Sequence, residues 1–162
     1  MPPDRTLLPW TKSCFVCGEE NPNGLQLKSW REGELVVTEY TTRDVDRGWK
    51  HIVHGGIAMT LLDEVMTWAA ILEAGAACVA AELTTRLRQP ITVGERLRIE
   101  GQTAGGKARL ILTEGRILNA DGAVVATATG KYLPMPSEHI SLCEKDFVTS
   151  PDALPPTEIF TR

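Results

Sequence analysis

The sequence predicts an α+β fold in which an antiparallel sheet of about six strands wraps around one long central helix. Eighteen residues from Gly55 form an apolar segment of helical character that contains only two charges, Asp63 and Glu64. Two segments before it and four after it are rich in β-branched residues and are separated by turn formers. Because the chain has 162 residues, we expect one domain with one main hydrophobic core.

The N-terminal segment, residues 1–24, is predicted to be an extended arm that docks on the domain. It holds four of the ten prolines and ends in the turn-forming sequence Asn21-Pro22-Asn23-Gly24. The domain is expected to span residues 25–134. Residues 135–162 follow as a tail without a sustained apolar period, so we expect that tail to be irregular and partly ordered.

The strands are predicted from alternating apolar residues and from the turn residues between them. Residues 25–30 and 34–42 flank Glu32-Gly33 as the two strands of a hairpin would. Four strands are expected after the helix, at residues 78–87, 96–103, 108–118 and 123–133. Gly105-Gly106 and Asp121-Gly122 are typical of hairpin turns and should connect the last three of these strands.

The helix lacks a polar face, which predicts that it lies inside the protein. Gly75 is a suitable stop, which gives a helix of about 20 residues and about 30 Å at 1.5 Å per residue. One sheet covers such a helix on one side only. We therefore expect a second copy of the chain on the other side, in a homodimer.

The bulk composition argues against several classes of partner. The formal charge is −4 and the pI is about 5.4, so there is no basic field for nucleic acid and none is expected as a partner. The longest apolar segment is interrupted by Asp63 and Glu64, so no membrane span is expected. The N-terminus lacks the features of a signal peptide, which favours a cytoplasmic location.

Four cysteines are expected to be free thiols in a reducing compartment. Cys14 and Cys17 form a CxxC motif followed by Gly18, which is typical of half a zinc site or of a redox pair. Neither a second CxxC nor a nearby histidine completes a metal site, so we expect no metal. The favoured interpretation is that Cys14 packs in the first loop and stabilises it.

Asp63 and Glu64 lie in an apolar helix, where an unpartnered buried carboxylate costs several kcal/mol, so we expect at least one of them to have a partner or a function. At 100° per residue, Asp63 shares a face with Gly56, Met59 and Thr67, and Thr67 could orient the Asp63 carboxylate or a water molecule. Glu64 is rotated further round the helix, towards Trp68. A structural ion pair or hydrogen bond is the alternative explanation for Asp63, with about even weight.

The helix begins at His54-Gly55-Gly56, where free backbone N–H groups could bind a negatively charged oxygen. His54 could equally be a cap, and the glycines could simply allow close packing. Gly55 and Asp63 are eight residues apart, or about 12 Å within one helix, so they cannot touch the same carbonyl group. If two helices lay antiparallel in a dimer, two equivalent sites would each combine groups from both chains.

Several motifs of the chain resemble those of one known family. They are His54-Gly55-Gly56, Leu61-Leu62-Asp63-Glu64, Ala81-Glu82-Leu83-Thr84 and Pro90-Ile91-Thr92-Val93-Gly94. In residue types and spacing they are similar to the hotdog-fold acyl-CoA thioesterases of the phenylacetate-pathway type. The segment Cys14-Phe15-Val16-Cys17-Gly18, with Asn21-Pro22 and Gly24-Leu25, resembles a subgroup of that superfamily. The likeness extends from about Cys14 to Leu133.

This resemblance implies a hotdog fold, dimers that often pair into tetramers, and hydrolysis of an acyl-CoA to a carboxylic acid and free coenzyme A. Gly55 would polarise the thioester carbonyl, and Asp63 of the partner subunit would act as general base or nucleophile. Thr67 would support the carboxylate, His54 belongs to the same motif, and Glu64 is the second candidate. Coenzyme A would be part of the substrate, with no cofactor or metal required.

Gly56, Met59, Thr84 and Arg86 are the predicted substrate-binding residues. Met59 suggests an apolar acyl pocket and Arg86 a contact with coenzyme A phosphates, although such residues also occur as core and as solvated charges. The chain departs from several relatives at Arg47-Gly48-Trp49, where they have Asn or Gln, and at Ala80, where some have serine. A non-catalytic acyl-CoA-binding module and a hydratase or dehydratase are the alternatives, and the acyl group stays open.

Overall fold

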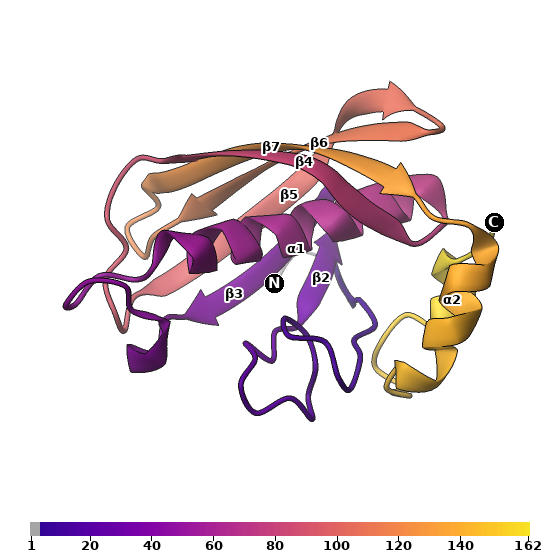
Figure 1. Cartoon of the computed structure of the whole chain (residues 1–162), viewed down its shortest axis with the longest axis horizontal. Coiled ribbons are helices and arrows are strands. Elements are labelled where there is room, and N and C mark those ends of the chain that lie inside the picture. Colours follow the sequence, from indigo (N-terminus) through magenta and orange to yellow (C-terminus); the bar gives the residue numbers. More distant parts are fainter. Residues whose placement is uncertain (1–3) are drawn as a thin grey trace.

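The computed structural model describes residues 4–162, which form a seven-stranded antiparallel sheet with one long helix against it (Figure 1). The order of strands in the sheet is β1-β2-β3-β5-β6-β7-β4. The elements that build this layer are β1 (Arg5–Leu7), β2 (Ser29–Glu32), β3 (Leu35–Thr41), α1 (Gly55–Ala74), β4 (Cys78–Leu87), β5 (Arg96–Lys107), β6 (Leu110–Leu118) and β7 (Val124–Pro134). The predicted α+β class and the wrapped central helix are confirmed.

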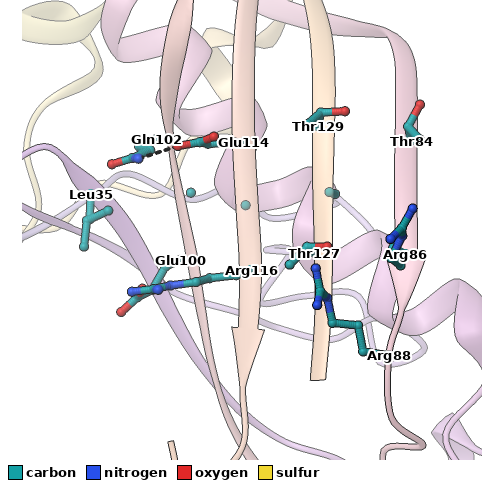
Figure 2. Close-up of a pocket in the computed structure, with 13 residues that line it drawn as sticks. Leu35, Thr84, Arg86, Arg88, Glu100, Gln102, Glu114, Arg116, Thr127 and Thr129 are labelled. Atoms are coloured by element: carbon teal, nitrogen blue, oxygen red, sulfur yellow. Dashed lines mark hydrogen bonds and ion pairs between the residues drawn. The ribbon is translucent and has the colours of Figure 1, made fainter. Parts of the chain in front are cut away.

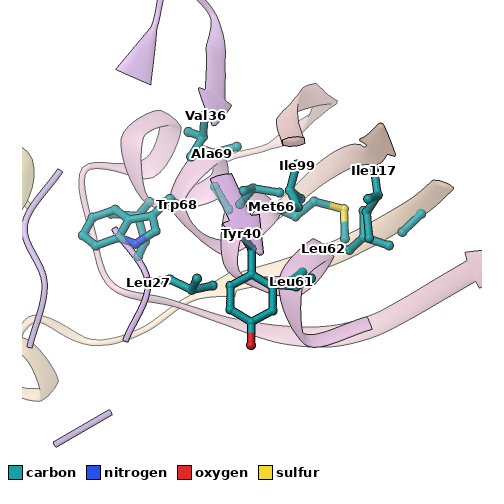
Figure 3. Packing of buried hydrophobic residues seen from close by; sticks show 14 of the residues in the cluster. Leu27, Val36, Tyr40, Leu61, Leu62, Met66, Trp68, Ala69, Ile99 and Ile117 are labelled. Atoms are coloured by element: carbon teal, nitrogen blue, oxygen red, sulfur yellow. The ribbon is translucent and has the colours of Figure 1, made fainter. Parts of the chain in front are cut away.

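Helix α1 forms the centre of the hydrophobic core, as its apolar sequence predicts. It ends at Gly75, whose left-handed φ of 62° and N–H bond to the Ile71 carbonyl close the last turn. The side chains of Leu62 and Met66 are fully buried against the sheet (Figure 3), and that of Val65 between them is also fully buried. By length and composition α1 could cross a membrane, but in this fold half of it is buried inside the domain.

Glycines in two central strands allow α1 to approach the sheet closely. A Cβ atom added to Gly101 in β5 would lie 2.8 Å from the backbone carbonyl group of Val65 in the helix. One added to Gly115 in β6 would lie 3.2 Å from Met66 and 3.3 Å from Leu62. A strand glycine commonly marks such a close approach. The distance between helix and sheet is therefore set by residues without side chains.

The strand boundaries differ from the prediction in three places. The first predicted strand, residues 25–30, begins only at Ser29, because Leu25 and Leu27 donate their N–H groups to the arm. The seventh strand, β1, comes from the arm and pairs with β2. Gly105-Gly106 does not form a hairpin turn: both glycines lie inside β5, at positive φ, where the register with β6 shifts between Thr103 and Gly105. The turn falls at Ala108-Arg109, because the glycines adopt the conformation of a β-bulge instead.

The arm and the tail pack against each other beside the domain. The Trp10 carbonyl accepts the Val148 N–H at 3.0 Å, and Leu7 forms a bridge to Ala153. Trp10 itself is buried. The tail contains two short helices, α2 (Ser137–Cys143) and α3 (Pro156–Ile159). Two single-turn 3₁₀ helices complete the fold, η1 (Asp44–Asp46) before α1 and η2 (Glu144–Asp146) in the tail.

Strand β4 is an edge strand of unusual length. It pairs with β7 on one side, and no strand among residues 4–162 pairs with its other side. Ten residues long, it exposes most of its side chains, including Val79 at 45% and Leu87 at 48%. A long exposed edge with apolar side chains is a template for pairing with another chain.

Replacing Gly101 by alanine should destabilise the protein because the new methyl group meets the helix backbone, which cannot rotate away. We expect a loss of about 2–3 kcal/mol in the free energy of unfolding, measured by urea denaturation. Gly115→Ala is the matched control: two of its nearest neighbours are flexible side chains, so its loss should be about 1 kcal/mol. Equal losses would show that the helix-to-sheet distance is not set at Gly101.

Candidate active site

The start of α1 is capped by a histidine side chain. His54 has an extended backbone, and its Nδ1 atom accepts the Gly56 N–H at 2.9 Å. The Ile57 N–H is bound to the His54 carbonyl at 2.9 Å. His54 therefore serves as the N-cap of the helix, which is one of the two roles that the sequence left open for it.

The Gly55 N–H is the free donor at this helix start. Within residues 4–162 it has no hydrogen-bond acceptor, whereas the two amides after it are both bound. Gly55 lies at a cavity of about 360 Å³ whose lining includes Trp49, Ile52 and Leu87. Trp49 is 82% exposed, so this apolar rim is uncovered in the single chain. An N–H at a helix start facing a cavity is suited to bind an oxygen that carries negative charge.

A buried aspartate fixes the loop that leads into α1. The Asp46 carboxylate accepts the Arg43 N–H at 2.7 Å, the Arg43 guanidinium at 2.8 Å and the Tyr40 hydroxyl. Burial alone would raise the pKa of Asp46, but the hydrogen bonds from Arg43 and Tyr40 lower it. The Asp46 carbonyl in turn accepts the His54 N–H at 2.9 Å. This network sets the direction in which the helix begins.

The Asp63 carboxylate is held at one oxygen by β7. The Tyr132 hydroxyl donates to Oδ1 at 2.7 Å, and the Thr67 hydroxyl lies 3.4 Å from the same atom. No group in the described chain donates to Oδ2, and Asp63 is only partly buried. The aspartate is thus oriented by two hydroxyls, with its second oxygen left for a water molecule or a substrate.

Tyr132 is the site residue that the sequence analysis missed. It is fully buried, and burial together with the Asp63 carboxylate raises the pKa of its phenol well above the usual range. The Tyr132 ring lies so close to Gly130 that a Cβ atom added there would be 2.5 Å from the ring atom Cε2. In the sequence, the glycine two residues before Tyr132 was the one available sign that a large side chain packs on that side of β7. Only the fold shows that this side of the strand faces Asp63.

Glu64 lies in a different environment from its neighbour. Trp68 Nε1 donates to Glu64 Oε1 at 3.1 Å, and the charge of Glu64 raises the pKa of the Cys17 thiol in the arm. Burial is the main cause that raises the pKa of Glu64 to about 8, with Cys14 and Asp63 adding to it. The structure therefore does not bring Glu64 together with Asp63 at one site.

Two of the four predicted substrate-binding residues lie on the helix side and two on the opposite face of the sheet. Gly56 and Met59 belong to the first turns of α1, and Met59 is 41% exposed. Thr84 and Arg86 line a cavity of about 540 Å³ on the outer face (Figure 2). Arg88 and Arg116 line it too, and Arg116 pairs with Glu100 at 2.7 Å. Arg86 has no ion pair within residues 4–162.

The two chemical groups of the helix cannot meet within one chain. Gly55 and Asp63 stand eight residues apart on a straight α1, about 12 Å along its axis. Gly55 lies close to the end of β4, since a Cβ atom there would be 2.9 Å from Leu87 Cδ1. Asp63 faces β7 in the middle of the sheet. A single chain therefore presents a free N–H donor and a free carboxylate oxygen at separate places.

Comparison with solved structures identifies this architecture. The PaaI protein of E. coli, from the phenylacetic acid degradation operon, is 21% identical over 69% of this chain and 81% of that one, with a TM-score of 0.64. The protein smu.793 of Streptococcus mutans, solved bound to acetyl CoA, is 20% identical over 63% and 82%, with a TM-score of 0.59. The sheet wrapped around α1 is the hotdog fold.

The central part of the sequence matches a family model. The model of the thioesterase superfamily matches residues 50–126, which include α1 and most of the strands after it. A thioesterase superfamily protein called RHA08564 is 30% identical over 74% of this chain and 59% of that one, with a TM-score of 0.67. A search of curated proteins finds no match. Residues 50–126 thus match the thioesterase superfamily, within a chain that has the hotdog fold; the place of the chain in the CxxCG subgroup stays a prediction.

Tyr132→Phe should release Asp63 from β7 without changing the ring that fills the core. We expect the free energy of unfolding to fall by roughly 1.5–3 kcal/mol, because a hydrogen bond to a charged group is lost. Thr67→Val is the graded comparison: its hydroxyl lies 3.4 Å from Oδ1, so the loss should stay below about 1 kcal/mol. Denaturant unfolding of both variants measures this. A Tyr132→Phe protein as stable as wild type would contradict the assignment.

Proposed function

We propose that this protein hydrolyses an acyl-CoA thioester to a carboxylic acid and free coenzyme A. The observation that carries the proposal is the Asp63 carboxylate, which Tyr132 and Thr67 hold by one oxygen while the other has no partner in residues 4–162. The match of residues 50–126 to the thioesterase superfamily supports thioester hydrolysis in general. The similar Streptococcus mutans protein, solved bound to acetyl CoA, supports coenzyme A as part of the substrate.

In the proposed reaction Asp63 acts on water as a general base. Oδ1 stays bound to Tyr132, so Oδ2 takes a proton from the water that attacks the thioester carbonyl carbon. The carbonyl oxygen gains negative charge, which the free Gly55 N–H and the positive end of the α1 dipole stabilise. The C–S bond then breaks, the electron pair leaves with the coenzyme A sulfur, and the proton on Asp63 passes to that thiolate. Direct attack by Asp63 is the alternative route.

We further propose that each site combines groups from two chains. The unpaired edge of β4 supports an antiparallel β4 contact between two copies, which would continue the sheet across the dimer. Gly55 lies beside Leu87 at one end of that edge, so Gly55 of one chain would approach the middle of α1 in the partner. Such a contact would also cover Leu87 and Val79, which are half exposed in the single chain.

The proposed substrate carries an apolar acyl group. Trp49, Ile52 and Leu87 surround the cavity at Gly55, and their exposed apolar surfaces favour a hydrocarbon or aromatic chain over a charged one. The Arg47-Gly48-Trp49 segment replaces the amide side chain that several relatives use. Water would therefore be positioned by the Asp63 group and not from this loop.

A panel of straight-chain and aromatic acyl-CoA thioesters tests the activity. Wild-type protein should release free thiol from at least one member, and Asp63→Asn should lower that rate roughly 10²–10⁴-fold while remaining folded, because a general base is lost. Glu73→Gln, an exposed substitution on the same helix, should keep the wild-type rate. Protection of the protein by an acyl-CoA without thiol release would indicate a binding module, and hydration of an enoyl-CoA would indicate a hydratase.

Gly55→Pro should abolish the proposed oxyanion contact while keeping the helix start. Proline suits the first helical position, and His54 before it has the extended backbone, φ −61° and ψ 133°, that proline requires. We expect kcat to fall roughly 10²–10³-fold, as for loss of one oxyanion donor. Gly55→Ala keeps the N–H and displaces only the flexible Leu87 side chain, so it should retain most activity.

Mixing the two inactive variants separates shared sites from sites within one chain. Subunits of Gly55→Pro and Asp63→Asn, refolded together in equal amounts, form mixed dimers that hold one intact site each. Random pairing should restore about a quarter of the wild-type rate if the sites are shared across a two-fold interface. A mixture as inactive as its components would contradict the shared site.

A further inference from the structure

The CxxC motif forms a rigid turn over α1 that the proposed thioesterase chemistry does not use. The Gly18 N–H binds the Cys14 carbonyl at 2.9 Å, and a Cβ atom on Gly18 would lie 2.2 Å from that same oxygen. The segment before β2 holds the turn in place, because the N–H groups of Leu25 and Leu27 donate to the carbonyls of Phe15 and Val16, each at 2.9 Å. The two cysteines are thus held close together.

The two thiols of this turn differ in exposure and in hydrogen bonding. Cys14 is partly exposed, and its Sγ accepts the Val16 N–H at 3.3 Å. Cys17 is buried, and its Sγ lies 3.5 Å from the Thr11 hydroxyl. The Cys17 thiol beside it is the main cause that lowers the pKa of Cys14 to about 5, against the opposing effect of burial. The pKa of Cys17 is raised by Cys14 and by burial.

Three charged side chains from three other segments interact electrostatically with this pair. Glu64 of α1 raises the pKa of Cys17, Asp146 of η2 raises the pKa of Cys14, and Cys17 raises the pKa of Lys28 before β2. Glu64 has its pKa raised to about 8, mainly by burial and next by the Cys14 charge. Once Cys14 has reacted and lost its charge, that second effect disappears and the pKa of Glu64 falls. A larger fraction of Glu64 is then ionised near neutral pH and available to take up a proton.

A metal does not account for the cluster. Within residues 4–162 no three cysteine, histidine or acidic side chains are grouped as metal ligands. A structural zinc site needs four such ligands. A reactive outer thiol and a buried second thiol are instead the parts that thiol–disulfide exchange uses, and the partly buried Glu64 carboxylate is able to take the proton of the second thiol.

We propose that Cys14 and Cys17 form a thiol–disulfide exchange site for low-molecular-weight disulfides, with Glu64 as proton acceptor. The Cys14 thiolate attacks one sulfur of the disulfide RSSR, forms a mixed disulfide and releases RS⁻. Cys17 then gives its proton to Glu64, directly or through one water molecule, and attacks Cys14 Sγ, which releases the second RS⁻. The two cysteines are oxidised to a disulfide, and RSSR is reduced to two RSH once the thiolates take up protons.

Glutathione disulfide is the probe for the first test. The reduced full-length protein is incubated with it, and disulfides are located by peptide mass spectrometry. We expect an intramolecular Cys14–Cys17 disulfide, whose formation releases two glutathione thiols. Cys143, which is exposed and unpaired, is the internal comparison; it should carry only a glutathione adduct, which releases one more thiol. Absence of the Cys14–Cys17 disulfide while Cys143 reacts would overturn the proposal.

The pH dependence of alkylation tests whether Cys14 is the attacking thiol. Between pH 8 and pH 6 the iodoacetamide rate of free N-acetylcysteine should fall roughly 70-fold, as expected for an ordinary thiol of pKa near 8.5. The rate at Cys14 should stay within about twofold over the same range, because a thiol with a pKa of about 5 remains ionised. A parallel fall at both thiols would contradict its role.

Glu64→Gln tests the second step. The mixed disulfide on Cys14 should accumulate in this variant. Its closure should also lose the rise with pH that the wild-type protein shows below pH 8, where Glu64 ionises once the Cys14 charge is gone. Glu73→Gln on the same helix is the matched control and should close like wild type. Cys17→Ser should stop at the mixed disulfide. Unchanged closure and an unchanged pH profile in Glu64→Gln would remove Glu64 from the site.

Discussion

The contact between α1 and the sheet determines where every group of the candidate site lies. Gly101 sets how closely the helix backbone approaches β5, and the fully buried Val65 and Met66 fix its rotation. With that rotation fixed, Asp63 faces β7 and its hydroxyl donor Tyr132. The geometry of the carboxylate therefore depends on core packing more than on any contact made at the site itself.

The rotation of the helix also explains why two neighbouring carboxylates have unrelated surroundings. A step of 100° separates their directions, so Asp63 points to the sheet and Glu64 to the arm. Two hydroxyl groups donate to Asp63. Glu64 accepts one indole N–H, Cys14 raises its pKa, and its own charge raises the pKa of Cys17. The two acidic residues of the apolar helix are therefore tolerated for different reasons: Asp63 is bound by hydroxyls of β7 and α1, and Glu64 by the indole of Trp68.

Patterns within one segment could be predicted from the sequence, and contacts between segments could not. Gly75 ends α1 as expected, because helix termination is a local property of glycine. Gly105-Gly106 looked like a turn, but the conformation of a glycine pair also suits a bulge, and pairing with β6 decides between them. Tyr132 stayed hidden because its partner is 69 residues away and no periodicity records which strand faces Asp63.

The unsatisfied features of the chain occur together on the β4 side of α1, which gives the proposed dimer a physical reason. Within residues 4–162 the outer edge of β4 lacks a partner strand, and the Gly55 N–H next to Leu87 lacks an acceptor. Pairing of two β4 edges would satisfy the first directly. It would also bring a second helix beside the first, so that the gap of about 12 Å between Gly55 and Asp63 is bridged by the partner. In this arrangement the interactions that stabilise the dimer also complete the site, and activity should require assembly.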